Sequence, residues 1–391
     1  MTVSSRYQVV WIDPARTGQR ERVEETLRRR VQELGLDPAQ EVVFLDEQGL
    51  AQLDARAPIA AVYFGGKAAS DEATAAIERL RRLAAFVLPV VPTLRRYTSL
   101  VPEGLHAVSG FAAADDAALE GVAGQVLEEL GLVRGKRRVF LGYRRDKSSK
   151  VAEQLYHALD ARGFDVFLDT HSAPAGTLFE SALWERMSDT DVLVLLDAPG
   201  TLDSRGMAEQ LARAAQLGVG VLQLLWPEHA RAVETELCET EYLDEEDFQR
   251  GDANLKGGLP LRHLGLQRVA MTVEALRART MAARRSRLVG ELCRAAERAG
   301  MSAAVQPEGH VDMVRRGQTL RVRPVVGYPD AVAAEDVFEA SRKPPVAAFV
   351  LYDPAWMPER RARHVDWLNK QLPDTVRLLR TTEIDAWVRA R

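Results

Sequence analysis

Four short polar segments that follow apolar runs hold the residues best suited to chemistry. They are Tyr-Arg-Arg-Asp at 143–146, the segment 169–176, Asp-Ala-Pro-Gly at 197–200 and Trp-Pro at 226–227. Guanidinium groups can clamp phosphates, an aromatic ring can stack on a base, and carboxylates can bind ribose hydroxyls. Ligands of parallel α/β sheets bind beyond the carboxyl ends of the strands. This set of residues therefore suits a nucleotide-sized ligand.

Other kinds of site find no support in the sequence. The chain has no GxxxxGK[ST], HExxH or GxSxG motif, and no GxGxxG follows its first apolar run. P-loop ATPases, zincins, α/β-hydrolases and Rossmann dehydrogenases are therefore disfavoured. The two cysteines, Cys238 and Cys293, are too far apart in sequence for a CxxC site. We expect no metal and no resident cofactor.

Composition limits the class of protein. The 391 residues are 46% hydrophobic and 28% charged, which is typical of folded protein and predicts about two to three domains. A net charge of -4 provides no global attraction to nucleic acid or to an anionic membrane. The basic run at 277–287 is interpreted as the solvated face of an amphipathic helix rather than as a nucleic-acid contact. With no membrane-span or signal-peptide pattern, we expect a cytoplasmic protein.

Strands and helices alternate around the candidate residues, which predicts a parallel sheet covered on both faces. The acidic segment 234–252 is predicted to be loop or irregular helix, and a long basic helix is expected at 267–298. The predicted strands of this central part are 138–143, 164–169, 191–197 and 218–226, and its other predicted helices are 151–163 and the stretch that ends at Gly218.

The motifs of the central part resemble a TIR (Toll/interleukin receptor) domain. The resemblance rests on VFLGYRRDKSSKVAEQLYHALDARGFDVFLDTHSAPAGTLFESAL, followed by DVLVLLDAPGTLDSRGMAEQLARA. The first strand ends in Tyr-Arg-Arg, a helix follows, and a Phe-Leu-Asp strand leads into a BB loop that ends at Gly176. The match covers residues 136–230, or as far as 280 with the trailing helix. It implies a flavodoxin-like parallel sheet.

The resemblance also implies an activity. Many TIR domains cleave NAD+, release nicotinamide and form ADP-ribose or a cyclic isomer, and related bacterial proteins act in antiphage defence. By resemblance, Tyr143 and Arg144 line the substrate site, and Asp169, Gly176 and Phe179 border it. A glutamate from the helix after the third strand would stabilise the positive charge that develops at C1′ of the ribose. From the residues alone, Asp169 could equally cap the loop and Phe179 could equally pack in the core.

The sequence departs from the TIR pattern at this glutamate. The pattern is Ser-x-Trp-x-x-x-Glu, and alignment on Ser204 puts Gly206 at the tryptophan and Gln210 at the glutamate. A glutamine can hydrogen-bond a hydroxyl, but it carries no charge and cannot act as a base. Glu209 is the fallback, although adjacent helical positions differ by about 100° in direction. Gln210 is either natural or a substitution for glutamate.

Two further domains are expected beside the TIR domain, which we assign to residues 134–280. Residues 1–133 are assigned to an N-terminal α/β domain that is either TIR-like or a sensor, with strands at 7–12, 41–46, 58–65 and 85–91. Residues 281–391 are assigned to a C-terminal α+β domain of unknown role. Its antiparallel strands are joined by the turn Arg316-Gly317, and α/β alternation follows.

These inferences predict an immune effector of bacterial antiphage defence that binds NAD+ as substrate and cleaves it. By resemblance we expect a homo-oligomer or filament formed through the TIR domains, and a trigger protein or ligand on the flanking domains. The alternative is a non-catalytic TIR scaffold or nucleotide-sensing module. Gly206 and Gln210 favour this alternative because the residues expected for catalysis are missing.

Overall fold

The computed structural model describes residues 7–16, 18–34, 36–54, 57–66, 70–83, 85–133, 136–168, 184, 186–203, 205–251, 257–306, 309–342, 345–355, 357–373 and 375–390. The chain divides into two compact units, Met1–Gly135 and Lys136–Arg391. Each unit is described by itself.

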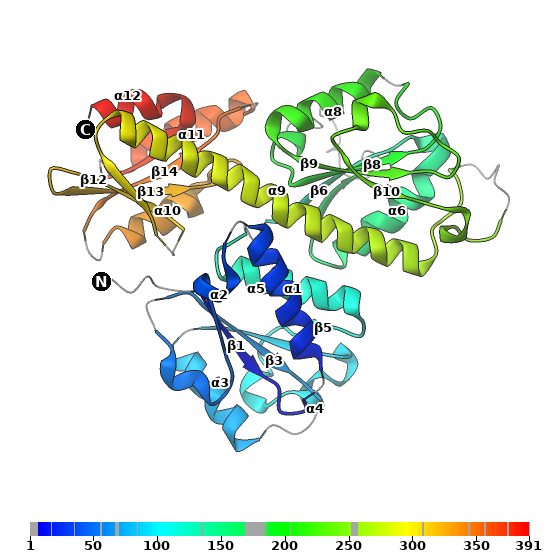
Figure 1. Ribbon diagram of the computed structural model, residues 1–391, viewed down its shortest axis with the longest axis horizontal. Helices are drawn as coiled ribbons and strands as arrows, with labels where there is room; N and C mark the ends of the chain where they lie inside the picture. The colour runs from blue at the N-terminus through cyan, green and yellow to red at the C-terminus, as the bar shows by residue number, and fades with distance from the viewer. Residues whose placement is uncertain are drawn as a thin grey trace. The chain divides into compact units, whose positions relative to one another are not determined.

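The first unit is a parallel sheet between two layers of helices (Figure 1). Its strands lie in the order β2-β1-β3-β4-β5, and all neighbouring pairs are parallel. The strands are β1 (Tyr7–Ile12), β2 (Val42–Leu45), β3 (Ile59–Phe64), β4 (Phe86–Val91) and β5 (Phe111–Ala112). The helices are α1 (Gln19–Glu33), α2 (Pro38–Glu41), α3 (Asp71–Arg82), α4 (Tyr97–Leu100) and α5 (Asp116–Glu129), with 3-10 turns η1 (Gly49–Gln52), η2 (Leu94–Arg96) and η3 (Glu103–Leu105). The predicted strands of this part are confirmed.

The central domain opens the second unit and has the same sheet connectivity. Its order is β10-β9-β8-β6-β7, all parallel. The strands are β6 (Arg138–Gly142), β7 (Asp165–Leu168), β8 (Val192–Asp197), β9 (Gly220–Leu225) and β10 (Glu239–Tyr242), and the helices are α6 (Arg145–Asp160) and α8 (Arg205–Leu217), with 3-10 turns η4 (Val233–Thr235) and η5 (Glu245–Asp247). Alternate residues of β8 enter two different cores, one shared with α6 and the other with α8. The predicted flavodoxin-like sheet is therefore confirmed.

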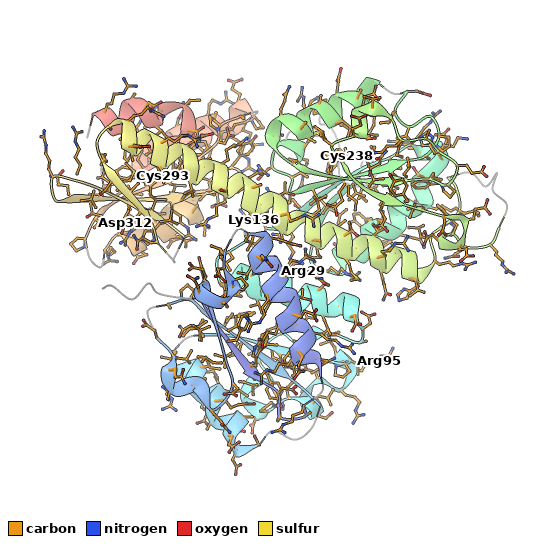
Figure 2. The ribbon with its side chains drawn as sticks, viewed as in Figure 1. Arg29, Arg95, Lys136, Cys238, Cys293 and Asp312 are labelled. Carbon is orange, nitrogen blue, oxygen red and sulfur yellow. The ribbon has the colours of Figure 1, made fainter. Side chains whose placement is uncertain are left out.

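Helix α9 (His263–Arg298) belongs to two cores. Its first half packs Val269 and Val273 against the central sheet, and its second half packs Leu292 and Ala296 against the C-terminal sheet. The boundary expected at residue 280 falls inside this continuous helix. Cys238 packs with the central domain and Cys293 with the C-terminal core, and both thiols are free (Figure 2).

The C-terminal sheet is mixed, in the order β11-β12-β13-β14-β15. Strands β11, β12 and β13 pair antiparallel, with the predicted turn Arg316-Gly317 between β12 and β13, and β13, β14 and β15 pair in parallel. The strands are β11 (Ser302–Val305), β12 (Val311–Arg315), β13 (Gln318–Pro324), β14 (Ala347–Tyr352) and β15 (Val376–Arg380). The helices are α10 (Ala331–Ala340), α11 (Glu359–Gln371) and α12 (Ile384–Arg389), and η6 (Thr381–Glu383) precedes the last.

The acidic segment 234–252 is not only loop or irregular helix, as predicted, because it contains strand β10. The strand lies at the edge of the sheet beside β9. Its two glutamates form ion pairs with α9: Glu239 with Arg279, and Glu241 with Arg268. These ion pairs with arginines of α9 explain why a strand can carry the acidic residues that led us to predict a loop.

The interpretation of the basic run 277–287 as a solvated face is wrong. The side chain of Arg277 is 2% exposed, and its Nε donates a hydrogen bond of 2.9 Å to the fully buried Asp191. Arg284 donates to the carbonyl of Thr190 at 3.1 Å, and Arg287 pairs with Asp353 at 2.6 Å. The run therefore fastens α9 to the central domain and to the C-terminal sheet.

Candidate functional site

Strands β6 and β8 lie side by side at the centre of the sheet, and the chain leaves them toward opposite faces. The helix that follows β6 packs in one core, whereas the helix that follows β8 packs in the other. Loops that diverge in this way leave a crevice at the carboxyl ends of the two strands, where ligands of open α/β sheets bind. The loops here begin at Tyr143 and Ala198.

A cavity of about 430 Å³ occupies one side of this crevice. We name it the Tyr143 cavity, and its lining residues are Tyr143, Arg144, Arg145, Gly200, Thr201, Asp203 and Met207. It thus draws on the end of β6, the loop after β8 and the first turn of α8. An aromatic ring, two guanidinium groups, a hydroxyl and a carboxylate meet in a volume typical of small-ligand sites.

Arg144 joins the two loops that form the crevice. Its Nη1 donates to the carbonyl oxygen of Gly200 at 2.9 Å, and its Nε donates to Asp146 at 2.8 Å. Gly200 has a φ of 83°, and a Cβ at this position would lie 2.7 Å from Arg144 Nη1. Glycine is therefore required both by the backbone conformation and by the approach of the guanidinium. These two bonds use two of the five donors of Arg144.

Gln210 lies one turn of α8 beyond Met207, which lines the Tyr143 cavity, but Gln210 is not itself a lining residue. Its Oε1 is buried and has no hydrogen-bond partner within the described part of the chain. A Cβ on Gly142 would lie 3.2 Å from this oxygen and 3.2 Å from Met207 Sδ, so the glycine at the end of β6 allows both side chains to approach. An unpaired buried oxygen costs about 1–3 kcal/mol, a cost that a hydrogen-bond donor placed at this oxygen would remove.

Glu209, the fallback residue, is exposed, whereas Gln210 is half-buried. This difference follows from the rotation of about 100° between adjacent helical positions. Glu209 thus has a different orientation from the residue that approaches Gly142. The other predicted site residues, Asp169, Gly176 and Phe179, lie outside the described residues.

A comparison with protein-family models bears on this part of the chain. Residues 139–255 match the family model of the TIR domain. The chain contains a TIR domain. The match begins in β6 and includes the Tyr143 cavity, Gln210 and β10.

No curated protein matches the chain. Among solved structures it is similar to a protein described as a response regulator with a GGDEF domain, at 13% identity over 69% of this chain and 98% of the other, with a TM-score of 0.29. It is also similar to tagatose-6-phosphate ketose/aldose isomerase from Escherichia coli, at 13% identity over 72% and 82% of the two chains, with a TM-score of 0.20.

A buried polar network holds the strand ends of the TIR domain together. Asp197, fully buried at the end of β8, accepts a hydrogen bond from Gln223 at 2.7 Å. Gln223 in turn accepts one from Thr240 at 2.9 Å, and His229 Nε2 lies 3.4 Å from Asp197. The network links β8, β9 and β10 directly beneath the loop that lines the Tyr143 cavity. It therefore positions that loop.

Within the described ranges, no cluster of three or more His, Cys, Asp or Glu side chains could hold a metal ion. No helix there is both long enough and apolar enough to cross a membrane. Burial raises the pKa of the Cys238 thiol; Arg231 lowers it, Asp197 raises it further, and the result stays above the ordinary value. A thiol with a raised pKa is a poor nucleophile at neutral pH.

The sequence did not single out Asp203 and Met207 as site residues. Both line the cavity, Asp203 from the loop after β8 and Met207 from α8. Two signals could have found them: Asp203 follows a buried strand within a few residues, and Met207 precedes Gln210 by three positions on one helix face. The structure brings Tyr143 and Arg144 together with both of them.

Proposed function

We propose that the TIR domain binds NAD+ in the Tyr143 cavity and cleaves its nicotinamide–ribose bond, with ADP-ribose or cyclic ADP-ribose as the product. The observation that carries this proposal is the unpaired, buried Oε1 of Gln210, one turn of α8 beyond a residue that lines the cavity together with Tyr143 and Arg144. The proposed setting is bacterial antiphage defence in the cytoplasm. The protein would act as a homo-oligomer or filament, and the flanking domains would respond to a trigger.

In this proposal, different residues at the Tyr143 cavity bind different parts of NAD+. The ring of Tyr143 can stack on a planar base, and the remaining donors of Arg144 can bind phosphate oxygens. Gln210 can accept a hydrogen bond from a ribose hydroxyl and so orient the sugar. Water attack at C1′ then gives ADP-ribose, and attack by an atom of the adenine gives the cyclic product.

The neutral amide of Gln210 limits the rate in this proposal. Positive charge develops at C1′ as the bond to nicotinamide breaks, and a carboxylate would stabilise that charge more strongly than an amide does. Loss of one such group commonly costs a factor of about 10² to 10³ in rate. We therefore propose a slow enzyme, which a glutamate at position 210 would accelerate.

A non-catalytic scaffold or nucleotide sensor is the second candidate. It is favoured by the same residue, because Gln210 can hold a sugar hydroxyl without supplying charge. In this case the domain would bind NAD+ or a related nucleotide and use it to control assembly.

Nicotinamide release from NAD+ tests both candidates. We would compare the Gln210 protein with Gln210→Glu and Gln210→Ala, at high protein concentration so that assembly is not limiting. The matched control is Glu209→Gln, which removes a carboxylate from the exposed neighbouring position. We expect Gln210→Glu to release nicotinamide about 10²-fold faster than the Gln210 protein or more, and Gln210→Ala and Glu209→Gln to give no increase.

The other outcomes are equally informative. If neither the Gln210 protein nor Gln210→Glu cleaves NAD+ although oligomers are present, the scaffold function is supported and the NAD+-cleaving function is rejected. If the Gln210 protein cleaves rapidly and Glu209→Gln abolishes cleavage, the catalytic carboxylate belongs to Glu209.

A further inference from the structure

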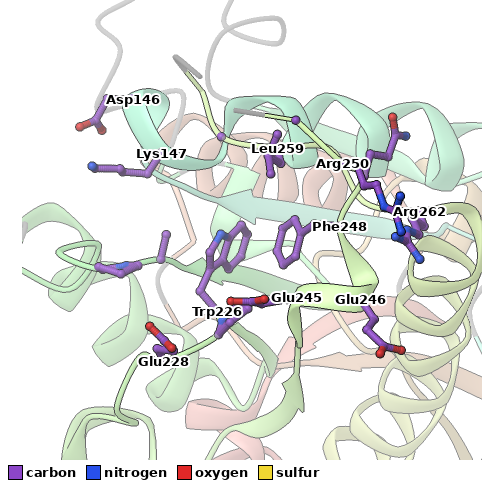
Figure 3. Close-up of a pocket in the computed structure, with 16 residues that line it drawn as sticks. Asp146, Lys147, Trp226, Glu228, Glu245, Glu246, Phe248, Arg250, Leu259 and Arg262 are labelled. Atoms are coloured by element: carbon purple, nitrogen blue, oxygen red, sulfur yellow. The ribbon is translucent and has the colours of Figure 1, made fainter. Parts of the chain in front are cut away.

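A second and larger cavity lies across the same edge of the TIR sheet (Figure 3). Its volume is about 840 Å³, which is large enough for a nucleotide. Its walls come from the first turn of α6, the loops after β8 and β9, and two stretches at 245–251 and 258–262. We name it the Trp226 cavity. It shares no lining residue with the Tyr143 cavity.

Two aromatic rings form the centre of the Trp226 cavity. Trp226 follows β9, and its ring centroid lies 5.6 Å from that of Phe248 at an angle of 52°. Phe248 is 8% exposed and Trp226 is half-buried, so the tryptophan ring is held in place and still presents a surface. Leu259 completes this apolar part. A fixed indole surface of this kind can stack on any nucleobase, because every base has a π-face.

Basic side chains surround the aromatic pair. Lys147, Arg250 and Arg262 line the cavity, and none of them forms an ion pair with another described residue. Figure 3 shows Arg250 and Arg262 together at one end of the cavity. Most arginines discussed above have carboxylate or carbonyl partners in the fold. Arg262 lowers the pKa of the Asp247 carboxyl, but neither guanidinium forms an ion pair or a side-chain hydrogen bond with a described residue, so both are suited to a phosphate group.

Carboxylates occupy another part of the wall. Figure 3 shows Glu228 and Glu245 on one side of the Trp226 ring. Glu228 has a φ of 54°, in the left-handed region that residues other than glycine rarely adopt, and such residues cluster at ligand sites. Carboxylates next to a stacking surface can accept hydrogen bonds from ribose hydroxyls or from the amino group of a base.

We propose that the Trp226 cavity is a second nucleotide site, separate from the Tyr143 cavity, which takes a purine 5′-phosphate. The base stacks on Trp226 beside Phe248, the carboxylates of Glu228 and Glu245 accept hydrogen bonds from the sugar or base, and Arg250 and Arg262 bind the phosphate. In this assignment the aromatic side chains bind the nucleobase, the carboxylates bind the sugar or the base, and the arginines bind the phosphate.

The probe for this site is AMP, which has a base, a ribose and one phosphate but no nicotinamide bond. Its binding to the full chain is measured without any cleavage, so this proposal and the NAD+-cleavage proposal can fail independently. We expect AMP to quench tryptophan fluorescence in a saturable manner. Trp226→Phe should remove most of the quenching and keep the affinity measured by calorimetry within a few-fold, because phenylalanine also stacks.

Two alanine variants separate the base from the phosphate. Trp226→Ala should weaken AMP binding about tenfold or more, the usual effect of losing one base–aromatic stack. Arg250→Ala should weaken AMP binding by a similar factor and leave adenosine binding unchanged, since adenosine has no phosphate. Ribose 5-phosphate, which has no base, should bind much more weakly than AMP.

Tyr143→Ala distinguishes AMP bound in the Trp226 cavity from AMP bound in the Tyr143 cavity, because Tyr143 lines only the latter. It should leave the AMP quenching unchanged. The proposal is overturned if AMP does not bind at millimolar concentration, or if its affinity survives both Trp226→Ala and Arg250→Ala. Loss of AMP binding in Tyr143→Ala alone would also overturn it and would assign AMP to the Tyr143 cavity. Melting curves of each variant establish that it is folded, and Trp226→Phe provides the test if Trp226→Ala is not.

Discussion

The N-terminal domain and the TIR domain have the same sheet connectivity but different carboxyl edges. In both, the strands run in the order 2-1-3-4-5 of their own domain, all parallel. In the N-terminal domain, the end of β3 lies against the backbone of α4: a Cβ on Gly65 would be 2.6 Å from the carbonyl oxygen of Leu100. The backbone amide of Asp13 donates to Glu47 at 3.1 Å. Loop groups thus pack against these strand ends, although the hydroxyl of Tyr63, near the end of β3, is buried without a hydrogen-bond partner among the described residues.

The carboxyl edge of the TIR sheet instead borders the Tyr143 and Trp226 cavities, whose linings include charged and aromatic side chains. Gln210 Oε1 lacks a hydrogen-bond partner, and Lys147, Arg250 and Arg262 lack ion-pair partners, within the described residues. Because the strand order is the same, the topology cannot explain this difference. The loops and the first turns of the helices decide whether this fold holds a ligand, as expected when function resides in sites placed on a shared fold.

The largest predicted effect is a loss of stability when a buried ion pair within one unit is broken. Arg277 and Asp191 are 2% and 0% exposed and form an ion pair of 2.9 Å between α9 and the amino end of β8. Arg277→Ala removes the ion-pair partner of the buried Asp191 carboxylate and leaves it the backbone amide of Arg138 as a donor, which should cost about 3–5 kcal/mol in the free energy of unfolding of the second unit. Urea denaturation measures the loss, and hydrogen exchange shows in which unit it occurs.

The neighbouring variant Arg279→Ala is the control for this prediction. Its ion pair with Glu239 is about one-third exposed on both sides, so its loss should cost less than about 1 kcal/mol. The corresponding variant of the first unit is Arg30→Ala, which breaks the buried pair with Glu120 at 2.7 Å. It should increase exchange in β1–β5 and leave the second unit unchanged. Equal losses for Arg277→Ala and Arg279→Ala would contradict the argument.

An intermediate effect is expected at glycines that end strands in the two domains. Gly65→Ala places a methyl group 2.6 Å from a backbone oxygen, so the backbone must move, at a cost of about 1–3 kcal/mol in the first unit. Gly142→Ala places it 3.2 Å from the mobile ends of Gln210 and Met207, which can shift, so the cost should be smaller. Thermal unfolding followed by hydrogen exchange compares them, and a larger loss for Gly142→Ala would refute the contrast.

The sequence predicted those strands that consist of a continuous apolar run, because such strands are buried on both faces of the sheet. Examples are β1, β3, β4 and β8. Strand β10 was missed because its sequence, Glu-Thr-Glu-Tyr, carries two carboxylates whose partners are arginines of α9. The basic run 277–287 was misjudged for the same reason: Arg277 is 86 positions from Asp191. Local periodicity cannot distinguish a solvated arginine from one that pairs with a buried carboxylate far away in the sequence.

The candidate site was predictable to a similar extent. The rule that ligands bind at strand ends pointed to Tyr143 and Arg144, and both line one cavity. The same rule pointed to Trp226 but not to its neighbours Phe248, Arg250 and Arg262, which no strand end precedes directly. These residues reach the cavity because the segment after β10 returns to the sheet edge, where Leu261 exchanges hydrogen bonds with Gln154 of α6. Such long-range pairing has no local signal in the sequence.

The smallest predicted effect depends on pH and concerns the start of that returning segment. Asp247 is largely buried; burial alone would raise its pKa, but hydrogen bonds from Arg268 and from the amide of Asp244 keep the pKa below its ordinary value. A carboxyl with a lowered folded-state pKa contributes stability above its unfolded pKa of about 3.9 and loses it as the pH falls through the folded pKa. Asp247→Asn should therefore be less stable than the natural protein by about 1 kcal/mol at neutral pH, since Arg268 is 44% exposed.

The stability difference between Asp247→Asn and the natural protein should stay constant from neutral pH down to about pH 5 and close below about pH 4. Urea unfolding of the second unit at a series of pH values measures it. Asp116→Asn is the control in the first unit, because its ion pair with Arg22 is 64% and 71% exposed and should contribute nothing measurable at any pH. A difference for Asp247→Asn that persists unchanged in acid would show that the carboxylate charge does not stabilise the segment, and that its shape and neutral hydrogen bonds hold Phe248 and Arg250 at the Trp226 cavity.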